Sequence, residues 1–263
     1  MFSNNKIKTI KNFLQNRHKY FNLLSHWGFK YKCPFCDFHS KDLLPIGIDN
    51  PTIRKYQIIG AGQRNACCPK CGSTDRERLV YTYLKYESSI FGKPLTRILH
   101  IAPEMIIANQ FVAHGFKKYI CGDFYAEGQH SDYSKDFVKH MDVQNLPFAD
   151  NSFDLIICNH VLEHVYDEKK AIQELFRVLA KGGQAILQVP FSPILDKTIS
   201  DPTITDKAIL EEKFGQKDHV RLFGTDYRTI LETYGFNVQI LKLHKRYTKF
   251  GFNPKEPLYI GKK

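Results

Sequence analysis

Seven cysteines are the residues of this 263-residue chain whose spacing points most directly to chemistry. Four of them form two Cys-x-x-Cys pairs, Cys33 with Cys36 and Cys68 with Cys71. Two such pairs, each presented by a tight turn, supply the four thiolates that surround a zinc ion in a tetrahedron. Four cysteines close the shell and leave no position for a catalytic water, so the zinc predicted here is structural. Cys67 precedes Cys68 directly, and the sequence leaves open which of the two is the ligand.

The cysteine count and the N-terminal composition also bear on where the protein works. An odd number of cysteines with two Cys-x-x-Cys pairs fits metal binding better than disulfide pairing. Lysines interrupt each candidate apolar stretch near the N-terminus, and no small-residue cleavage site follows, so a secretory signal is not expected. No apolar run approaches the roughly 20 residues of a membrane-spanning helix. We therefore expect a cytoplasmic protein.

Regular structure must position the reactive side chains, and apolar periodicity predicts where it lies. Strands are expected at 97–101, 118–122, 154–158 and 185–189, with two late strands at 237–243 and 257–261. A helix is expected over 167–180, ended by the basic turn and glycines of 181–183. Strands that alternate with helices predict βαβ units and a mostly parallel sheet.

Other helices are predicted outside this alternation. Thr74 and Glu77 have the spacing of a capping box at the start of a helix, and Thr225 is the expected N-cap of a later one. Residues 1–30 are predicted to form a basic amphipathic helix, because apolar residues recur at helical spacing over 6–25. The segment 37–67 between the two cysteine pairs must form a hairpin or an extended loop.

The most specific part of the sequence runs from Met141 to Val165. It contains the motifs Asp142-Val143, Leu146-Pro147-Phe148, Ser152-Phe153-Asp154 and Val161-Leu162-Glu163-His164-Val165. These motifs resemble the class I S-adenosylmethionine-dependent methyltransferases, in particular the methyltransferase-11 and -23 types. The run from Leu179 to Gly183 is similar to a segment of the same family. With the cysteine pairs included, the whole chain resembles a zinc-knuckle subgroup of these enzymes.

The resemblance implies an α/β fold: a Rossmann-like, mostly parallel seven-stranded sheet with helices on both faces, plus a small N-terminal zinc ribbon. We expect the basic helix at 1–30, a zinc-knuckle region at 31–75 and a class I methyltransferase domain at 76–263. Within that domain, 191–223 forms a long insertion after the fifth strand, long enough to cover a pocket like a lid.

The expected cofactor site lies beyond the carboxyl ends of the strands, where open parallel sheets bind ligands. Asp123 follows the second strand at a distance from Pro103 suited to an acid that hydrogen-bonds ribose hydroxyls. By resemblance, Asp123 binds ribose, and Asp142 or the Val143 backbone lies beside the adenine. Asn159, after the fourth strand, is expected beside the cofactor.

The first motif departs from the family pattern. The family usually has acid-x-Gly-x-Gly after the first strand, whereas this chain has His100 at the acid position and Ala102 and Glu104 at the glycine positions. Pro103 between them offers no N–H. These three residues are still expected at the cofactor, held differently from the family pattern, and Glu104 is the candidate replacement for the missing acid.

The acceptor side is expected to involve histidines. Methyl transfer to a hydroxyl needs a base, most often histidine. His160 and His164 follow the fourth strand, and His219 and Arg221 lie in the insertion. We predict His160, also beside the cofactor, or His219 as the base, Arg221 as a clamp for an anionic substrate, and His164 as a substrate contact.

The net charge of +11 bears on the partner. Residues 1–32 hold seven Lys/Arg and no acid, and residues 240–263 hold seven and one acid, so the body between them is close to neutral. Basic ends can meet phosphate. We expect a methyltransferase that O-methylates a small hydroxylated metabolite or sugar, with an rRNA or other nucleic-acid methyltransferase as a less favoured alternative, because no Asn-Pro-Pro-Tyr-type motif occurs. The other alternative is a non-catalytic zinc-ribbon binding module on a degenerate methyltransferase fold.

Overall fold

The computed structural model describes residues 23–125 and 137–263. Most of the helix predicted over residues 1–30 lies outside these ranges. The central element is a seven-stranded sheet with the order β12-β13-β9-β8-β5-β6-β7. Its strands are β5 (Ile98–Ile101), β6 (Tyr119–Asp123), β7 (Val138–His140), β8 (Phe153–Asn159), β9 (Leu179–Gln188), β12 (Asn237–Leu241) and β13 (Leu258–Lys262). Strand β13 runs antiparallel to both neighbours, and the other pairs are parallel.

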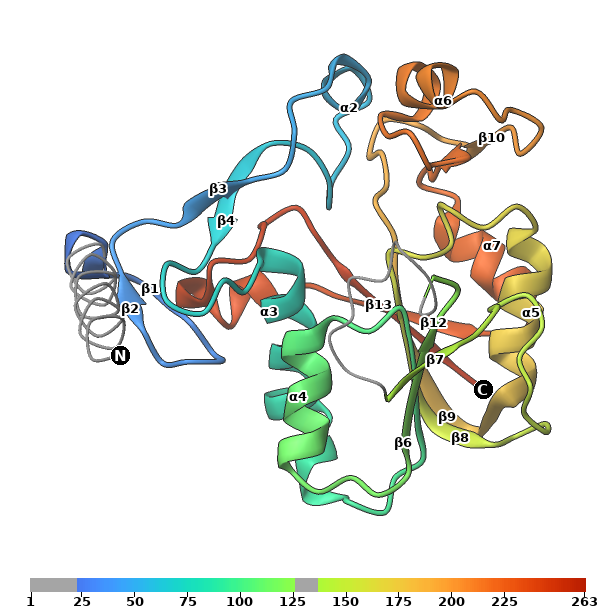
Figure 1. Ribbon diagram of the computed structural model, residues 1–263, viewed down its shortest axis with the longest axis horizontal. Helices are drawn as coiled ribbons and strands as arrows, with labels where there is room; N and C mark the ends of the chain where they lie inside the picture. The colour runs from blue at the N-terminus through green and yellow to red at the C-terminus, as the bar shows by residue number, and fades with distance from the viewer. Residues whose placement is uncertain (1–22, 126–136) are drawn as a thin grey trace, which may run out of the picture.

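Helices cover both faces of this sheet, as Figure 1 shows. One face carries α3 (Asp75–Thr82) and α4 (Met105–Ala113), and the other carries α5 (Glu168–Val178) and α7 (Tyr227–Thr233). Side chains of the central strand β8 alternate between the two cores: Leu155 packs with Leu79 and Phe111, while Ile156 packs with Leu175. A strand that is buried on both faces reads as a continuous apolar run, which is why the sequence predicted it well. The mostly parallel seven-stranded sheet is thus confirmed.

The remaining elements are short. They are β1 (Trp27–Lys32), β2 (His39–Ser40), β3 (Leu44–Ile46), α2 (Pro51–Lys55), β4 (Arg64–Cys67), the π-helical turn η1 (Tyr83–Glu87), β10 (Ile199–Ser200), α6 (Lys207–Phe214), β11 (Arg221–Leu222) and the 3₁₀ turns η2 (Ile90–Gly92), η3 (Leu243–Lys245) and η4 (Thr248–Phe250). In the part of the chain that the structure describes, no helix has the length and apolar character needed to cross a bilayer.

The end of α5 and the start of α7 differ from the sequence predictions. Helix α5 ends at Val178, and the chain turns extended at Leu179 to begin β9, which pairs with Phe153 of β8. Residues 181–183 therefore belong to the strand and do not cap the helix, so that prediction was wrong. The N-cap of α7 is Asp226 rather than Thr225. The capping box of Thr74 and Glu77 is confirmed, with both reciprocal hydrogen bonds present.

The cysteine-bearing N-terminal region packs against the sheet domain through buried arginines and acids. Arg78 on α3 is fully buried, and its guanidinium donates to the carbonyls of Ser73, Phe250 and Gly251. Arg64 on β4 forms a bidentate pair with the buried carboxylate of Asp75, both contacts being 2.7 Å. Such charge-assisted pairs fix orientation as well as contributing energy.

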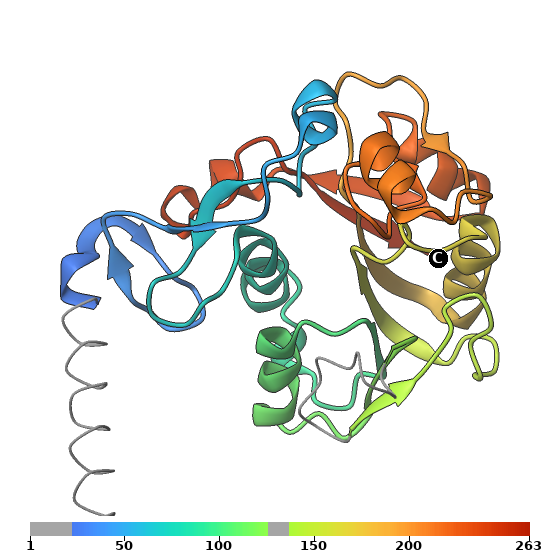
Figure 2. The same cartoon turned by 45° about the horizontal axis from the view of Figure 1, so that its top comes forward.

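The insertion at 191–223 docks on the N-terminal region. Helix α6 lies beside α2, as both views show (Figures 1 and 2). Apolar side chains of the insertion, Leu210, Phe214 and Leu222, form a small core with Ile58. The hydroxyl of Thr52 donates to the carbonyl of Glu212 at 2.5 Å. One side of the insertion is therefore buried against the segment that joins the two cysteine pairs.

Candidate functional site

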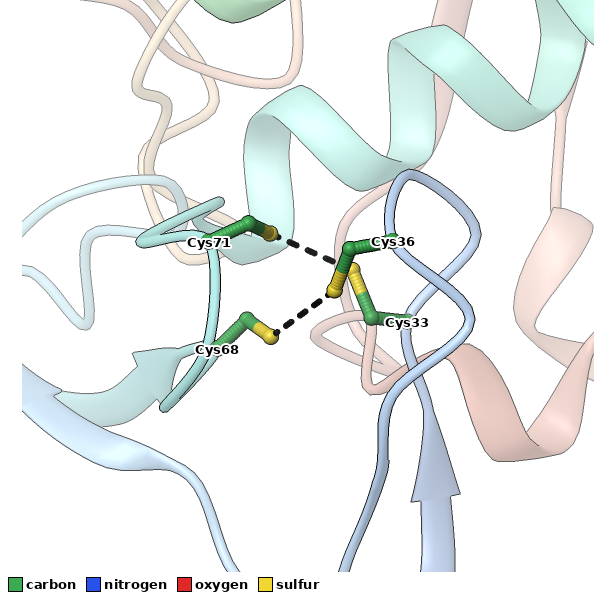
Figure 3. A group of neighbouring side chains, drawn as sticks. All are labelled: Cys33, Cys36, Cys68 and Cys71. Atoms are coloured by element: carbon green, nitrogen blue, oxygen red, sulfur yellow. Dashed lines mark hydrogen bonds between the residues drawn. The ribbon is translucent and has the colours of Figure 1, made fainter. Parts of the chain in front are cut away.

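The four predicted cysteine ligands come together. Figure 3 shows the thiols of Cys33 and Cys36 facing those of Cys68 and Cys71. The four Sγ atoms all lie within 4.8 Å of one another, with 3.5 Å between Cys33 and Cys71 and 3.8 Å between Cys36 and Cys68. Zn–S bonds of about 2.3 Å in a tetrahedron place the sulfurs roughly 3.8 Å apart. The spacing of this cysteine cluster thus fits a zinc ion.

The two turns that present these thiols are built alike. In each, the residue after the second cysteine donates its N–H to the carbonyl of the first: Asp37 to Cys33 and Gly72 to Cys68, both at 3.0 Å. Both residues adopt the left-handed region, with φ of 54° and 76°. Cys67 lies outside the cluster, and its thiol contacts the carbonyl of Gly72 at 3.3 Å. The geometry therefore selects Cys68 over Cys67.

A second feature is a pocket of about 300 Å³ at the carboxyl ends of β5, β6 and β8. It is lined by Ile101, Ala102, Asp123, Phe124, Tyr125, Met141, Asp142, Val143, Gln144, His160, Val161, His164, Val165, Tyr166 and Asp218. This is the edge at which an open parallel sheet binds its ligand. Five residues predicted beside the cofactor lie in the lining, together with His164, which was predicted to contact substrate. His100, Glu104, Asn159, His219 and Arg221 lie outside it.

Two lining residues hold unusual backbone conformations. Ala102 after β5 and His160 after β8 have φ of 47° and 54°, a region that residues with side chains seldom occupy. The N–H of Ala102 donates to Gly122 at 2.8 Å, and that of His160 donates to Gln188 at 2.7 Å. At position 102 an alanine thus adopts a left-handed backbone conformation that glycine adopts more readily. Strained residues of this kind cluster at functional sites.

The altered first motif forms a buried polar network behind the pocket. The Nε2 atom of His100 lies 2.9 Å from Oε2 of Glu104, and its Nδ1 lies 3.0 Å from the Tyr119 hydroxyl. Asn159 donates to Oε1 of Glu104 at 3.1 Å. Burial alone would raise the pKa of Glu104, but the hydrogen bond and charge of His100 outweigh it, so this pKa is lowered. The three residues thus act on the pocket from behind its wall.

Histidines and acids gather at the opposite wall. Nδ1 of His160 lies 3.4 Å from Oε1 of Glu163, and Nδ1 of His164 lies 3.2 Å from Oδ2 of Asp218. The rings of His164 and His219 meet edge to face with centroids 4.6 Å apart. Burial lowers the pKa of His219 to about 4, so this imidazole is neutral at physiological pH. His219 is 3% exposed.

Arg221 does not fit its predicted role as a substrate clamp. Its side chain is fully buried, and its guanidinium donates to the carbonyls of Leu162, Val165 and Tyr166 and pairs with Glu168 at 3.0 Å. No guanidinium surface is left for a substrate. The arginine instead fixes the loop that follows β8, which carries the pocket residues 160–166.

Several lining residues were not predicted. Tyr125 and Tyr166 are large, exposed aromatics at the pocket, and Asp218 reaches it from the insertion. Tyr125 follows the predicted ribose acid by two residues and donates its N–H to Oδ1 of Asp123 at 2.6 Å. Aromatic residues next to a predicted binding motif are the signal that could have pointed to them.

The central residues of the chain are similar to known methyltransferases. Residues 100–187 match the family described as "Methyltransferase domain". An uncharacterized methyltransferase, YcgJ, of Bacillus subtilis is 35% identical over 78 residues, covering 26% of this chain and 31% of that protein. A probable S-adenosylmethionine-dependent methyltransferase of Mycolicibacterium smegmatis is 29% identical over 107 residues, covering 39% of this chain and 35% of that protein.

The chain thus spans about a third of the length of these curated relatives. A solved structure of a SAM-dependent methyltransferase from Archaeoglobus fulgidus superposes with a TM-score of 0.46 at 16% identity, covering 70% of this chain and 93% of that one. The matched residues 100–187 hold β5, β6 and β8 and the pocket at their ends. The comparisons thus show that residues 100–187 are similar to a methyltransferase domain.

Proposed function

We propose that this protein is an S-adenosylmethionine-dependent methyltransferase that methylates a hydroxyl oxygen of a small metabolite or sugar. The observation that carries the proposal is the shared pocket of Asp123 and His160. An acid suited to ribose hydroxyls and a histidine suited to a hydroxyl proton line one cavity, which joins cofactor and acceptor chemistry.

The cofactor side of the pocket is supplied by three strand ends. Asp123 ends β6, where its carboxylate can accept from ribose hydroxyls. Asp142 accepts from the Gln144 N–H at 2.8 Å, which orients its carboxylate beside Val143 for the adenine. The apolar side chains of Ile101 and Met141 in the lining suit contact with the flat face of the adenine ring. The cofactor, when bound, supplies the methyl group on a sulfonium centre.

The acceptor side depends on His160. Both ring nitrogens of His160 are buried without a hydrogen-bond partner among residues 23–125 and 137–263. Burial lowers the pKa of His160, so the ring is neutral at pH 7 and able to take a proton. Glu163, 3.4 Å away, stabilises the charged imidazolium that results. Positioning and exclusion of water complete what an in-line methyl transfer requires of a protein.

The cysteine cluster supports a structural zinc ion in this proposal. Cys33, Cys36, Cys68 and Cys71 would hold it, and a four-thiolate shell leaves the ion no role in the reaction. The cluster ends four residues before α3 begins, and α3 carries Arg78 into the sheet domain. An ion there would fix the N-terminal region against the domain that binds the cofactor.

The altered first motif favours the alternative of a non-catalytic binding module. A methyl-transfer assay distinguishes that alternative from the proposed enzyme. The experiment is incubation of the full chain with radiolabelled S-adenosylmethionine and a fractionated cell extract. The proposal expects label in the small-molecule fraction and its loss in His160→Ala. Label in RNA would favour the nucleic-acid alternative, and no transfer into any fraction, despite cofactor binding, would favour the non-catalytic module.

A further inference from the structure

The side chains of Glu163, His164 and His219 form a second cluster with the composition of a metal site, and metal binding there is distinct from the role proposed for Glu163 beside His160. One ligand atom from each residue lies within 4.8 Å of the others. Glu163 and His164 come from the loop after β8, and His219 comes from the insertion just before β11. The three residues are thus brought together from positions more than fifty apart in the sequence.

The buried carboxylate of Glu163 is the observation that points to a ligand. Its side chain is 1% exposed, and its Oε2 atom has no hydrogen-bond partner among the described residues. The other oxygen, Oε1, faces His160 at 3.4 Å. A buried carboxylate oxygen without a donor is costly, so such atoms are usually matched by a hydrogen bond or a cation.

The surrounding groups suit a cation in the same place. His219 is 3% exposed, and its ring meets that of His164 edge to face with centroids 4.6 Å apart, so two imidazoles lie beside the buried carboxylate. Nδ1 of His164 contacts Oδ2 of Asp218 at 3.2 Å and its carbonyl at 3.1 Å. An outer carboxylate on one ring nitrogen is how proteins orient a metal-binding histidine and leave its other nitrogen for the ion.

We propose that Glu163, His164 and His219 bind a divalent transition-metal ion, of which Zn²⁺ is the probe. Two imidazoles and one carboxylate form a ligand set that leaves a coordination position open. Bonds of about 2.0–2.2 Å place ligand atoms roughly 3.4 Å apart, so side-chain movements on the order of an ångström close the site. This site is separate from the cysteine cluster, whose ligands are all thiols.

The place of the ion gives it a role. His164 and Asp218 line the pocket, so an ion held by His164 and His219 lies at the pocket wall. An ion there would offer its open position to an oxygen-bearing group of the acceptor. That role rests on the proposed methyltransferase function, whereas the existence of the site does not.

The test counts zinc in the full chain after dialysis against a zinc-buffered solution, by inductively coupled plasma mass spectrometry. His219→Asn and Glu163→Gln are expected to hold one zinc fewer per chain than the parent protein. His114→Asn is the control, because His114 is exposed and its ring lies against Gln110 and Phe91, away from the cluster. It should keep the parent count. Unchanged zinc in both His219→Asn and Glu163→Gln would overturn the proposal.

A measurement on the unaltered protein keeps the test independent of variant folding. Zinc-edge X-ray absorption should show nitrogen or oxygen neighbours at about 2.0–2.1 Å beside sulfur at about 2.3 Å. Sulfur neighbours alone would contradict the site. Calorimetry with S-adenosylhomocysteine on the same samples separates this result from the proposed function. If S-adenosylhomocysteine did not bind, the proposed methyltransferase function would be refuted. The zinc count would still test the metal site independently.

Discussion

The Nε2 atom of His100 lies 2.9 Å from the carboxylate of Glu104, across a turn in which Ala102 takes the left-handed conformation. The two side chains stand where the first motif of the resembled family is expected to have an acid and a glycine. The histidine is fully buried within the sheet, so it positions Glu104 and does not itself reach the pocket. The turn after β5 is thus made with an alanine in the left-handed conformation and is supported by a buried ion pair.

Glu104→Gln should weaken cofactor binding. The pKa of Glu104 is lowered, so its carboxylate is ionised at neutral pH, and its negative charge behind the pocket wall would attract the ammonium group of a bound cofactor. Loss of one charged interaction of this kind costs about 1.5–3 kcal/mol, or on the order of 10- to 100-fold in the dissociation constant of S-adenosylhomocysteine. Glu211→Gln, at an exposed pair with Lys217, is the control. Equal affinity in the two variants would show that Glu104 is only structural.

Cys36→Ser should lose one zinc and lower the melting temperature. Removing a thiolate opens the four-cysteine shell, and structural zinc contributes directly to folding free energy. Cys67→Ser is a matched control from the same segment, because Cys67 lies outside the cluster. It should keep both the metal and the melting temperature. If Cys67→Ser lost zinc while Cys68→Ser kept it, the assignment between these neighbours would be reversed.

Arg221→Met should destabilise the protein by about 3 kcal/mol or more, because the carbonyls of Leu162 and Val165 and the carboxylate of Glu168 would lose their donor in a buried place. Urea denaturation measures the change. Arg228→Met removes an exposed pair with Glu232 and should cost less than about 0.5 kcal/mol. Normal stability of Arg221→Met, combined with a raised KM for the acceptor, would instead support a substrate clamp.

Glu256→Gln should change how stability depends on pH. Burial raises the pKa of Glu256 from 4.5 to about 7, and Asp75 adds to the effect. Both carboxylate oxygens are buried without a hydrogen-bond partner in the described part of the chain. A folded-state pKa above the unfolded value means that stability is present at low pH and is lost as pH rises from about 4.5 through 7.

This difference in pKa means that ionised Glu256 destabilises the folded protein by about 3 kcal/mol above pH 7. Glutamine carries no such charge. The free energy of unfolding of Glu256→Gln should therefore increase relative to that of the parent protein as the pH rises from 5 to 8. Parallel pH profiles from urea denaturation would show that Glu256 ionises freely in the folded protein.

The parallel sheet could be predicted because its strands carry local signals. Strand β8 is buried on both faces and reads as one apolar run, and α5 repeats its apolar residues at helical spacing. Strand β7 carries no such signal, since it has three residues and pairs on one side only, with β6. Residues Leu179–Gly183 look like a helix end, but pairing with β8 decides the outcome.

The candidate site was predicted to the extent that its residues belong to compact motifs. Asp123 ends β6, and Asp142 and His160 lie within two residues of the ends of β7 and β8, so the topology of a parallel sheet brings them to one edge. The role of Arg221 could not be predicted in this way. Its partners lie 53 to 59 residues earlier in the chain, and local sequence cannot distinguish an arginine that binds substrate from one that holds a loop.

The proposed function requires that this chain bind S-adenosylmethionine in the pocket of Asp123 and His160. Calorimetric titration of the full chain with S-adenosylhomocysteine tests it most directly. We predict one saturable site per chain, weakened on the order of 10-fold or more in Asp123→Ala through loss of the ribose hydrogen bonds. An exposed acid changed in the same way, Asp150→Ala, should leave the affinity unchanged. No saturable binding by the folded protein, or equal affinity in Asp123→Ala, would contradict the claim.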